Sequence, residues 1–194
     1  MLGALVAPHV AAKVDREDVA AMIDAALSKR PSTRVEGVRG DGSSVKVEGQ
    51  HKAFPAVVRA LGAGVHVFMV GPAGSGKTTL AEKAAESLGK SFRAMSVGPQ
   101  STQYHLLGYQ DAQGRYVSTA FREAYELGGV FLLDEVDAGS ASVLTVINSA
   151  LANGACEFPD GRVKRHADFL CICAANTYGL GADRVYVGRQ QLDG

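Results

Sequence analysis

The chain of 194 residues is long enough for one sizeable core, or for a core with a small appendage. Hydrophobic residues make up 46% and charged residues 21%, and the equal numbers of basic and acidic residues give no indication of a nucleic-acid or membrane surface. No segment approaches the roughly 20 apolar residues of a membrane span, and the apolar start of the chain lacks the basic residues of a signal peptide. We therefore expect a soluble, cytoplasmic protein without membrane contact.

The first fifty residues predict a helix followed by a β-hairpin. The helix begins near Asp15, which suits an N-cap, and ends before Pro31, because apolar residues recur between them at helical spacing. Two segments of alternating residues, Arg34–Val38 and Ser44–Glu48, flank a Gly-Asp-Gly turn. Since this part contains no motif, we expect residues 1–50 to be an extension that packs on the core or binds a partner.

From residue 51 to residue 194, segments with helical and strand patterns alternate. Such alternation is typical of an α/β fold with a mostly parallel sheet between two layers of helices. The first strand is rich in apolar and β-branched residues, as buried strands are, and the polar stretch Gly98–Gly114 predicts an exposed functional loop. The expected strands are Val65–Val70, Phe92–Met95, Val130–Leu133 and Phe169–Ala174, and the expected helices are Phe54–Leu61, Lys77–Leu88, Ser118–Glu126 and Ala141–Asn153, the last of which ends at Gly154.

A glycine-rich loop directly follows the first of these strands and opens a helix. It matches the pattern G-x-x-x-x-G-K-[ST], in which backbone N–H groups converge on phosphate oxygens and glycines allow the close approach. Such a loop can arise by chance, but its place between a strand and a helix N-terminus is the one that phosphate binding requires. The expected nucleotide-binding residues are Gly71, Pro72, Ala73, Gly74, Ser75, Gly76, Lys77, Thr78 and Thr79.

The ligand expected in this loop is ATP or ADP together with Mg²⁺. The Lys77 ammonium group would bridge the β- and γ-phosphates, and the Thr78 hydroxyl would bind the Mg²⁺ ion. The loop therefore predicts a P-loop ATPase core.

Two carboxylates follow the strand Val130–Leu133. Asp134 would hold Mg²⁺ through water, as a hard oxygen ligand, and Glu135 would polarise the water that attacks the γ-phosphate. An acidic run on its own is a solvated loop more often than a site, but after a P-loop the Asp-Glu pair favours a hydrolase. Asp137 either belongs to this site or only caps the next helix.

Asn176 is the polar residue that ends the strand after the acidic one. The order of a P-loop, an acidic strand and a strand that ends in asparagine resembles the AAA+ ATPases, in which a polar side chain called sensor 1 stands at this place. An amide there would orient the attacking water and sense the γ-phosphate without adding charge. The resemblance implies that Lys77, Glu135 and Asn176 act together in the hydrolysis of ATP to ADP and phosphate.

Among the AAA+ ATPases, the chain most resembles the MoxR and cobaltochelatase small-subunit group, also called the dynein-related AAA_5 family, which includes phage-borne members. The resemblance rests on Gly71–Thr78, Gly128–Asp137, Phe158–Gly161 and Asn176–Gly179, and the third of these segments is similar to a β-hairpin that precedes sensor 1. It implies a ring, expected as a hexamer, that uses ATP hydrolysis to remodel a protein partner. That partner would be an unknown protein substrate or a von Willebrand-type partner.

The end of the chain departs from the family pattern. Gly181–Gly194 resembles the segment that leads to the arginine finger, but Arg184 and Arg189 come earlier than the finger should, and no sensor-2 arginine or helical lid follows. We therefore expect this chain to be part of a longer protein. Because the finger of a neighbour completes such a site and the lid closes over it, we also expect weak hydrolysis by this chain alone.

Two other functions stay open. One is a motor that acts on DNA, for which a basic cluster beside the hairpin would bind phosphates, although no aromatic residues alternate with the cluster and a solvated turn explains it equally well. The other is a nucleotide-switched binding module with little turnover, which Glu135 and Asn176 disfavour. The basic cluster consists of Arg162, Lys164, Arg165 and His166.

Several other side chains have a structural and a functional interpretation. In the polar stretch, Tyr104, His105 and Tyr109 would contact either a neighbouring subunit or the substrate. His51 and His66 are expected to be structural.

The cysteines are expected to be reduced core thiols. They are odd in number, and Cys171 and Cys173 alternate within an apolar strand. A metal site at these two residues would lack its second pair of ligands.

Overall fold

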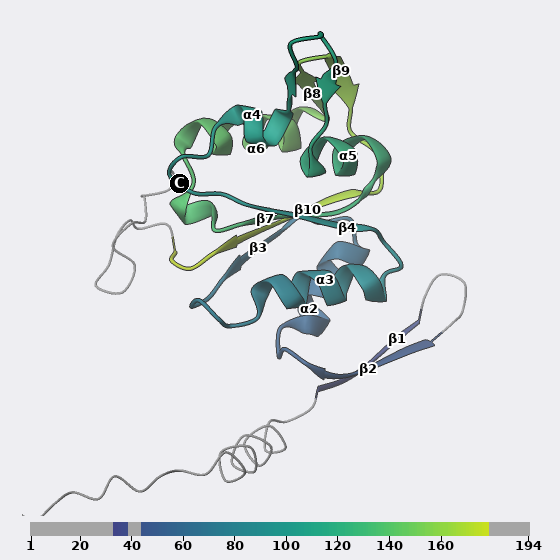
Figure 1. The fold of residues 1–194 in the computed structure, drawn as a ribbon. Helices are drawn as coiled ribbons and strands as arrows, with labels where there is room; N and C mark the ends of the chain where they lie inside the picture. The colour runs from purple at the N-terminus through teal and green to yellow at the C-terminus, as the bar shows by residue number, and fades with distance from the viewer. Residues whose placement is uncertain (1–32, 39–43, 179–194) are drawn as a thin grey trace, which may run out of the picture.

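A computed structural model of the chain describes residues 33–38 and 44–178 (Figure 1). The helix expected between Asp15 and Pro31 and the segment Gly181–Gly194 lie outside these residues. The hairpin expected near the N-terminus is confirmed, because β1 (Thr33–Val38) pairs antiparallel with β2 (Ser44–Gln50). The division of the chain at residue 50 stays a prediction.

The centre of the molecule is a parallel sheet between two layers of helices, which confirms the expected α/β fold. In the sheet, β10 lies between β3 and β7, and β4 pairs with the other side of β7. The strands are β3 (Val67–Val70), β4 (Phe92–Ser96), β7 (Gly129–Asp134) and β10 (Phe169–Ala175). Figure 1 shows α2 (Phe54–Gly62) and α3 (Lys77–Ser87) on one face of the sheet, with α4 (Gln103–Leu107), α5 (Ala120–Leu127) and α6 (Ala141–Asn153) on the other.

Side chains of the central strands alternate between the two faces and build a separate core on each. In β7, Val130 and Leu132 pack with residues of α2 and α3, whereas Phe131 and Leu133 pack with residues of α5 and α6. All four side chains are fully buried. A strand that is buried on both faces needs apolar residues at every position, so β7 could be predicted from its continuous apolar run.

The position of β3 corrects the expectation of a buried first strand. In the described part of the chain, β3 is bonded only to β10, and the Phe68 side chain in its middle is 54% exposed. The strand also begins at Val67 rather than at Val65. Apolar, β-branched residues favour a strand, but they do not distinguish a central position from an edge position.

Two further hairpins lie on the side of α5 and α6. The one expected before β10 is confirmed as β8 (Ala155–Phe158) and β9 (Gly161–Lys164). The polar stretch Gly98–Gly114, in contrast, is not a plain loop, because it contains α4 and the strand β5 (Tyr109–Gln110), which pairs with β6 (Tyr116–Val117). Regular secondary structure therefore lies where the sequence predicted an exposed loop.

Candidate functional site

The glycine-rich loop connects the end of β3 to the start of α3. Gly74 and Gly76 have φ values of 75° and 84°, in the left-handed region that costs a residue with a side chain about 1–2 kcal/mol. Gly76 is the N-cap of α3, so the first N–H groups of this helix face the loop. The Gly71 N–H donates to the carbonyl of Ala175 at 3.2 Å, which ties the loop to the end of β10. The geometry is therefore that of a cradle for an anion.

The rest of the loop is compact and reaches the surface. Its outer part is a turn in which the Ser75 N–H donates to the Pro72 carbonyl at 3.2 Å, and Ala73 between them is exposed. Thr78 and Thr79 follow in the first turn of α3, and both are exposed. The nine residues predicted to bind nucleotide thus form one continuous surface at the carboxyl end of β3.

Lys77 joins this loop to the end of β10. Its ammonium nitrogen Nζ donates to the Gly71 carbonyl at 2.7 Å, to the Pro72 carbonyl at 3.2 Å and to Oδ1 of Asn176 at 2.8 Å. Lys77 and Asn176 are 99 positions apart in the sequence. The structure therefore brings together two of the residues that sequence analysis selected independently, and it points the positive charge of Lys77 toward the mouth of the loop.

Thr78 and Asp134 make the second contact across the site. The Thr78 hydroxyl donates to Oδ2 of Asp134 at 2.7 Å, and Oδ1 of Asp134 accepts from the Glu135 N–H at 2.9 Å. A hydroxyl and a carboxylate at this distance are hard oxygen donors of the kind that Mg²⁺ prefers. The chemistry of these side chains therefore fits a divalent cation at the carboxyl end of β7.

Glu135 has an unusual backbone conformation. It is the only residue other than glycine with a positive φ in the described part of the chain, at 58°, and its side chain is exposed. This left-handed residue separates β7 from a short 3₁₀ helix, Val136–Ala138. The turn thus places an exposed carboxylate directly after Asp134, at the carboxyl end of β7.

Asp137 is the polar residue whose place sequence analysis did not find. The suggestion that it caps the next helix is wrong, because the N-cap of α6 is Ser140. Asp137 is instead fully buried and accepts hydrogen bonds from the backbone of Asn176 and Thr177. Its partners lie about forty positions away, just after another strand, so only its place two residues after the Asp-Glu pair hinted at a role.

A cavity of about 490 Å³ adjoins the glycine-rich loop on its β3 side. Its lining combines apolar side chains, such as Val57, Phe68 and Leu80, with the polar side chains of His51 and Lys52. His51 has a structural contact, because its ring nitrogen Nδ1 accepts from the Ala53 N–H at the start of α2. The cavity continues directly into the loop, since Gly71, Ser75 and Lys77 also line it.

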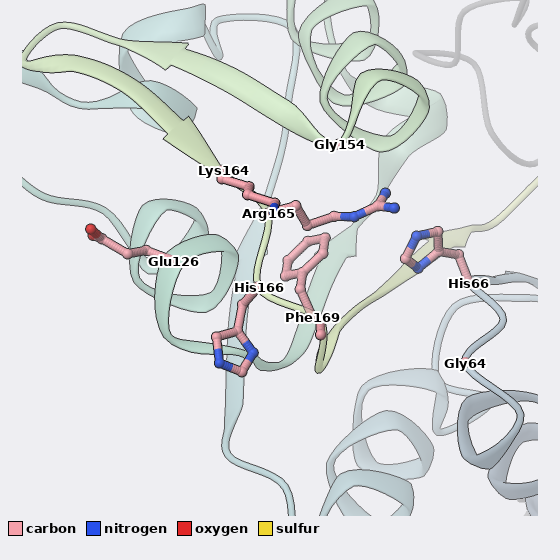
Figure 2. A pocket seen from close by; sticks show the side chains of 9 residues that line it. Gly64, His66, Glu126, Gly154, Lys164, Arg165, His166 and Phe169 are labelled. Atoms are coloured by element: carbon pink, nitrogen blue, oxygen red, sulfur yellow. The ribbon is translucent and has the colours of Figure 1, made fainter.

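A second depression, of about 690 Å³, lies at the opposite end of the sheet, where β3 and β10 begin (Figure 2). It contains most of the predicted basic cluster, and Figure 2 shows Arg165 and His66 on one side of Phe169 and His166 on the other. Arg165 is a structural residue, since its Nη1 donates to the Leu151 carbonyl at 2.6 Å near the end of α6.

The two histidines of this depression also have backbone partners. Nδ1 of His66 accepts from the Cys171 N–H, and Nδ1 of His166 accepts from the Asp168 N–H. Burial and the nearby Arg165 lower the pKa of His66. The contacts of His66 agree with the expectation that it is structural. Of the basic cluster, only Arg162 and Lys164 are exposed and lack a side-chain contact with the backbone in the described structure.

The cysteines and the aromatic residues of the polar stretch lie apart from the P-loop. All three cysteines are free thiols, and the hydrogen bond with Cys173 together with burial raises the pKa of Cys171. In α4 and β5, the side chains of Tyr104 and Tyr109 are more than half exposed. They form part of the outer surface rather than of the site.

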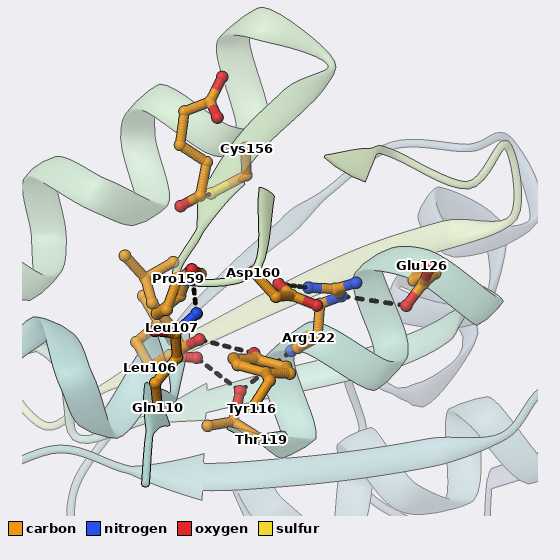
Figure 3. A network of polar contacts seen from close by, with 11 residues as sticks. Leu106, Leu107, Gln110, Tyr116, Thr119, Arg122, Glu126, Cys156, Pro159 and Asp160 are labelled. Atoms are coloured by element: carbon orange, nitrogen blue, oxygen red, sulfur yellow. Dashed lines mark hydrogen bonds and ion pairs between the residues drawn. The ribbon is translucent and has the colours of Figure 1, made fainter. Parts of the chain in front are cut away.

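Arg122 of α5 fixes the β8–β9 hairpin to the rest of the molecule (Figure 3). Its guanidinium group donates to Asp160 in the hairpin turn at 2.6 Å and to Glu126 at 3.0 Å, and it stacks over Phe158 at 4.6 Å from the ring centre. Burial opposes the charge of Arg122, but the two carboxylates outweigh it and raise its pKa. Gln110 adds a contact by donating to the Pro159 carbonyl at 3.1 Å, so the two hairpins form one unit.

Replacing Arg122 with methionine should lower the free energy of unfolding by about 2–3 kcal/mol, because it removes a nearly buried charge from two carboxylates. Denaturation by urea measures this loss. The matched control is Arg162→Met, since Arg162 is exposed and lies 3.7 Å from an exposed Glu157, and it should change stability by less than about 0.5 kcal/mol. Equal losses in both variants would show that Arg122 contributes no more to the free energy of unfolding than an exposed arginine does.

Comparison with known proteins identifies the family. Residues 66–185, more than half of the chain, match the AAA domain family of the dynein-related subfamily. The match includes the glycine-rich loop, the acidic residues after β7 and Asn176. No helix in the described part of the chain is long and apolar enough to cross a membrane.

Curated relatives match over shorter stretches. The Lon protease of Salinispora arenicola is 38% identical over 86 residues, which are 42% of this chain and 11% of that protein. Lon protease 1 of Bacillus subtilis is 37% identical over 73 residues, which are 36% of this chain and 9% of that protein. The chain therefore spans only 9% to 11% of the length of these relatives.

Solved structures share the fold. NtrX from Brucella abortus aligns with a TM-score of 0.56 at 19% identity, over 83% of this chain and 35% of that one, and it has also been crystallised in complex with ADP and with ATP. An ATPase structure from Cytophaga hutchinsonii aligns with a TM-score of 0.54 at 17% identity, over 72% of this chain and 40% of that one. With a parallel sheet, a glycine-rich loop at the end of β3 and the family match over most of the core, the chain belongs to the dynein-related subfamily of AAA domains and has the fold of an AAA+ ATPase domain.

Proposed function

We propose that this chain binds ATP with Mg²⁺ and hydrolyses it, as the motor core of an AAA+ ring that remodels a protein partner. The observation that supports this most is the pairing of Lys77 with Asn176 and of Thr78 with Asp134. These contacts draw the ends of three strands and the start of α3 into one polar cluster. Cation, hydroxyl, carboxylate and amide are the four kinds of group that phosphoryl transfer from a metal-bound nucleotide needs.

The phosphates would lie over the N-terminus of α3. There the N–H groups of the loop and the helix dipole favour negative charge, and Nζ of Lys77 already lies among three oxygen acceptors at 2.7–3.2 Å. Phosphate oxygens would replace part of these acceptors. The base and ribose would occupy the adjoining cavity, in which the apolar lining suits the faces of a planar ring and the side chains of His51 and Lys52 suit its polar edge.

Mg²⁺ would be held by Thr78 and, through water, by Asp134. When bound, the ion supplies charge that neutralises the oxygens of the β- and γ-phosphates. Glu135 would accept a proton from the attacking water, and Asn176 would donate a hydrogen bond that orients this water or the γ-phosphate. Asn176 can do so because its amide nitrogen is the end of the side chain that does not accept from Lys77.

The partner of the motor would meet the surface that carries the two joined hairpins. Exposed Tyr104 and Tyr109 give this surface aromatic contact area, which suits a neighbouring subunit or a protein substrate. A chaperone of the MoxR kind and a chelatase motor with a von Willebrand-type partner both agree with these features. In either case a ring, expected as a hexamer, would complete each site with an arginine of the neighbour.

Calorimetric titration of the chain with ATP and ADP, with and without Mg²⁺, tests the proposal. We expect both nucleotides to bind and Mg²⁺ to tighten the binding of ATP. Thr78→Val removes the hydroxyl but keeps the shape of the side chain, so it should weaken binding of Mg-ATP about tenfold and abolish most of the gain from Mg²⁺. Thr145→Val, an exposed threonine of α6, is the control and should behave as the unmodified chain. Absence of binding at millimolar nucleotide would refute the proposal.

Two alternatives have their own measurements. The exposed Arg162 and Lys164 favour a motor that acts on DNA, and this function requires salt-dependent DNA binding that is lost when both are neutralised. A nucleotide-switched binding module requires nucleotide binding without phosphate release, even in an assembled preparation at saturating ATP. Release of phosphate together with an absence of DNA binding would leave the protein-remodelling motor.

A further inference from the structure

Asp137 joins the ends of two neighbouring strands from inside the protein. It lies in the 3₁₀ helix that follows β7, and its side chain is fully buried. Its carboxylate oxygens accept from the Asn176 N–H at 3.2 and 3.3 Å, from the Thr177 N–H at 3.0 Å and from the Thr177 hydroxyl at 2.9 Å. The two carboxylate oxygens of Asp137 are thus the acceptors of all these bonds, and the donors belong to the two residues that follow β10.

The chemistry of this contact specifies an aspartate. Three donors converge on one side chain, and an ionised carboxylate offers only acceptors, so each donor finds a lone pair. Asparagine has the same shape, but its NH₂ group would face N–H donors and leave at least one of them unpaired in a buried place. Glutamate would extend the carboxylate by one further carbon into a space that is already filled.

The bonds of Asp137 continue into the candidate site. The residue whose N–H it holds, Asn176, accepts from Nζ of Lys77 through Oδ1 at 2.8 Å. The backbone at Asn176 therefore sets where its amide lies relative to the P-loop lysine. Because a side chain of this length has few torsions, a displacement of its backbone moves the amide by a similar distance.

We propose that Asp137 is a positioning residue, which fixes the backbone of Asn176 and Thr177 so that the Asn176 amide meets the γ-phosphate of ATP. This inference rests on the proposed function, and it adds a reason why the site would bind ATP more tightly than ADP. ADP lacks the γ-phosphate and does not reach Asn176. Asp137 therefore controls the affinity for ATP without touching the nucleotide.

Calorimetry of Asp137→Asn, Asn176→Ala and the double variant, each with Mg-ATP and Mg-ADP, tests this inference. Loss of one hydrogen bond to the γ-phosphate should lower the affinity of Asp137→Asn for ATP about tenfold and leave its affinity for ADP within about twofold. In the Asn176→Ala background, the same substitution should change neither affinity by more than about twofold, because the amide that it positions is gone. Asp160→Asn is the control, since it breaks a partly buried ion pair in the β8–β9 hairpin and should keep the ratio of the two affinities.

The outcomes separate this inference from the proposed function. If Asp137→Asn weakens ATP and ADP equally, or if its effect persists in Asn176→Ala, then Asp137 only supports the fold and the inference is wrong. If the unmodified chain binds neither nucleotide, the proposed function fails and this inference fails with it. Should Asp137→Asn not fold, Thr177→Val removes one donor and should shift the affinity ratio in the same direction by about threefold; an unchanged ratio in that variant would overturn the inference.

Discussion

Lys77→Ala should abolish nucleotide binding, with an affinity for Mg-ATP that is at least about 100-fold lower than that of the unmodified chain. The substitution removes the positive charge at the mouth of the loop, where Nζ of Lys77 lies within 3.2 Å of the Gly71 and Pro72 carbonyls and 2.8 Å from Asn176. It also leaves Oδ1 of Asn176 without its donor. The lost charge acts on phosphates that both nucleotides carry, so both should lose affinity, and the disturbance of Asn176 should add to the loss for ATP.

Calorimetric titration measures this loss, and Lys83→Ala is its control. Lys83 lies on the same helix, and its contact is an exposed ion pair with Glu86. Its removal should leave nucleotide affinity unchanged. Binding of Mg-ATP by Lys77→Ala at near-normal affinity would mean that the glycine-rich loop does not hold the phosphates.

Glu135→Gln should retain nucleotide binding and lose turnover. Replacing the carboxylate with an amide removes the base that would accept a proton from water, a change that typically costs a factor of about 100 or more in rate. The backbone at Glu135 can keep its φ of 58°, because glutamine has the same stem, and the Thr78–Asp134 contact does not involve the replaced group. Phosphate release at saturating Mg-ATP, measured at equal chain concentration and equal assembly state, gives the comparison.

Glu82→Gln is the matched control for this substitution, because Glu82 is an exposed glutamate on the outer side of α3. It should release phosphate at the rate of the unmodified chain. If Glu135→Gln also keeps that rate, another group activates water and the role given to Glu135 is wrong. If Glu135→Gln loses affinity for Mg-ATP together with its turnover, the carboxylate acts in binding rather than in proton transfer.

The elements that could be predicted from the sequence are those that their own residues determine. The continuous apolar run of β7 and the helix Ala141–Asn153, with its glycine cap at Gly154, lie where periodicity and capping residues put them. The glycine-rich loop could be predicted for the same reason, since the glycines that its backbone conformation requires lie within the loop itself. The family match agrees with the resemblance that these motifs carry.

The features that could not be predicted depend on contacts between distant residues. The short helix α4 and the strand β5 are held by tertiary bonds, such as Tyr116 to the Leu107 carbonyl and Gln110 to the Pro159 carbonyl. Arg122 has the sequence pattern of an exposed helix residue, yet it is nearly buried, because its partner Asp160 lies 38 positions away in the sequence. Asp137 is the same kind of case at the site itself, because its partners follow β10, about forty positions further along the chain.

Under the role proposed for Glu135, its left-handed backbone sets stability against turnover at a single residue. Glycine would adopt a φ of 58° without steric cost, whereas a residue with a side chain is disfavoured there by about 1–2 kcal/mol. A search for more stable variants that ignored turnover would therefore be drawn to this position, and it would exchange the carboxylate for a relaxed main chain. With the proposed role of Glu135, thermostability and turnover are separate targets for anyone who engineers this domain, and residue 135 is where they diverge.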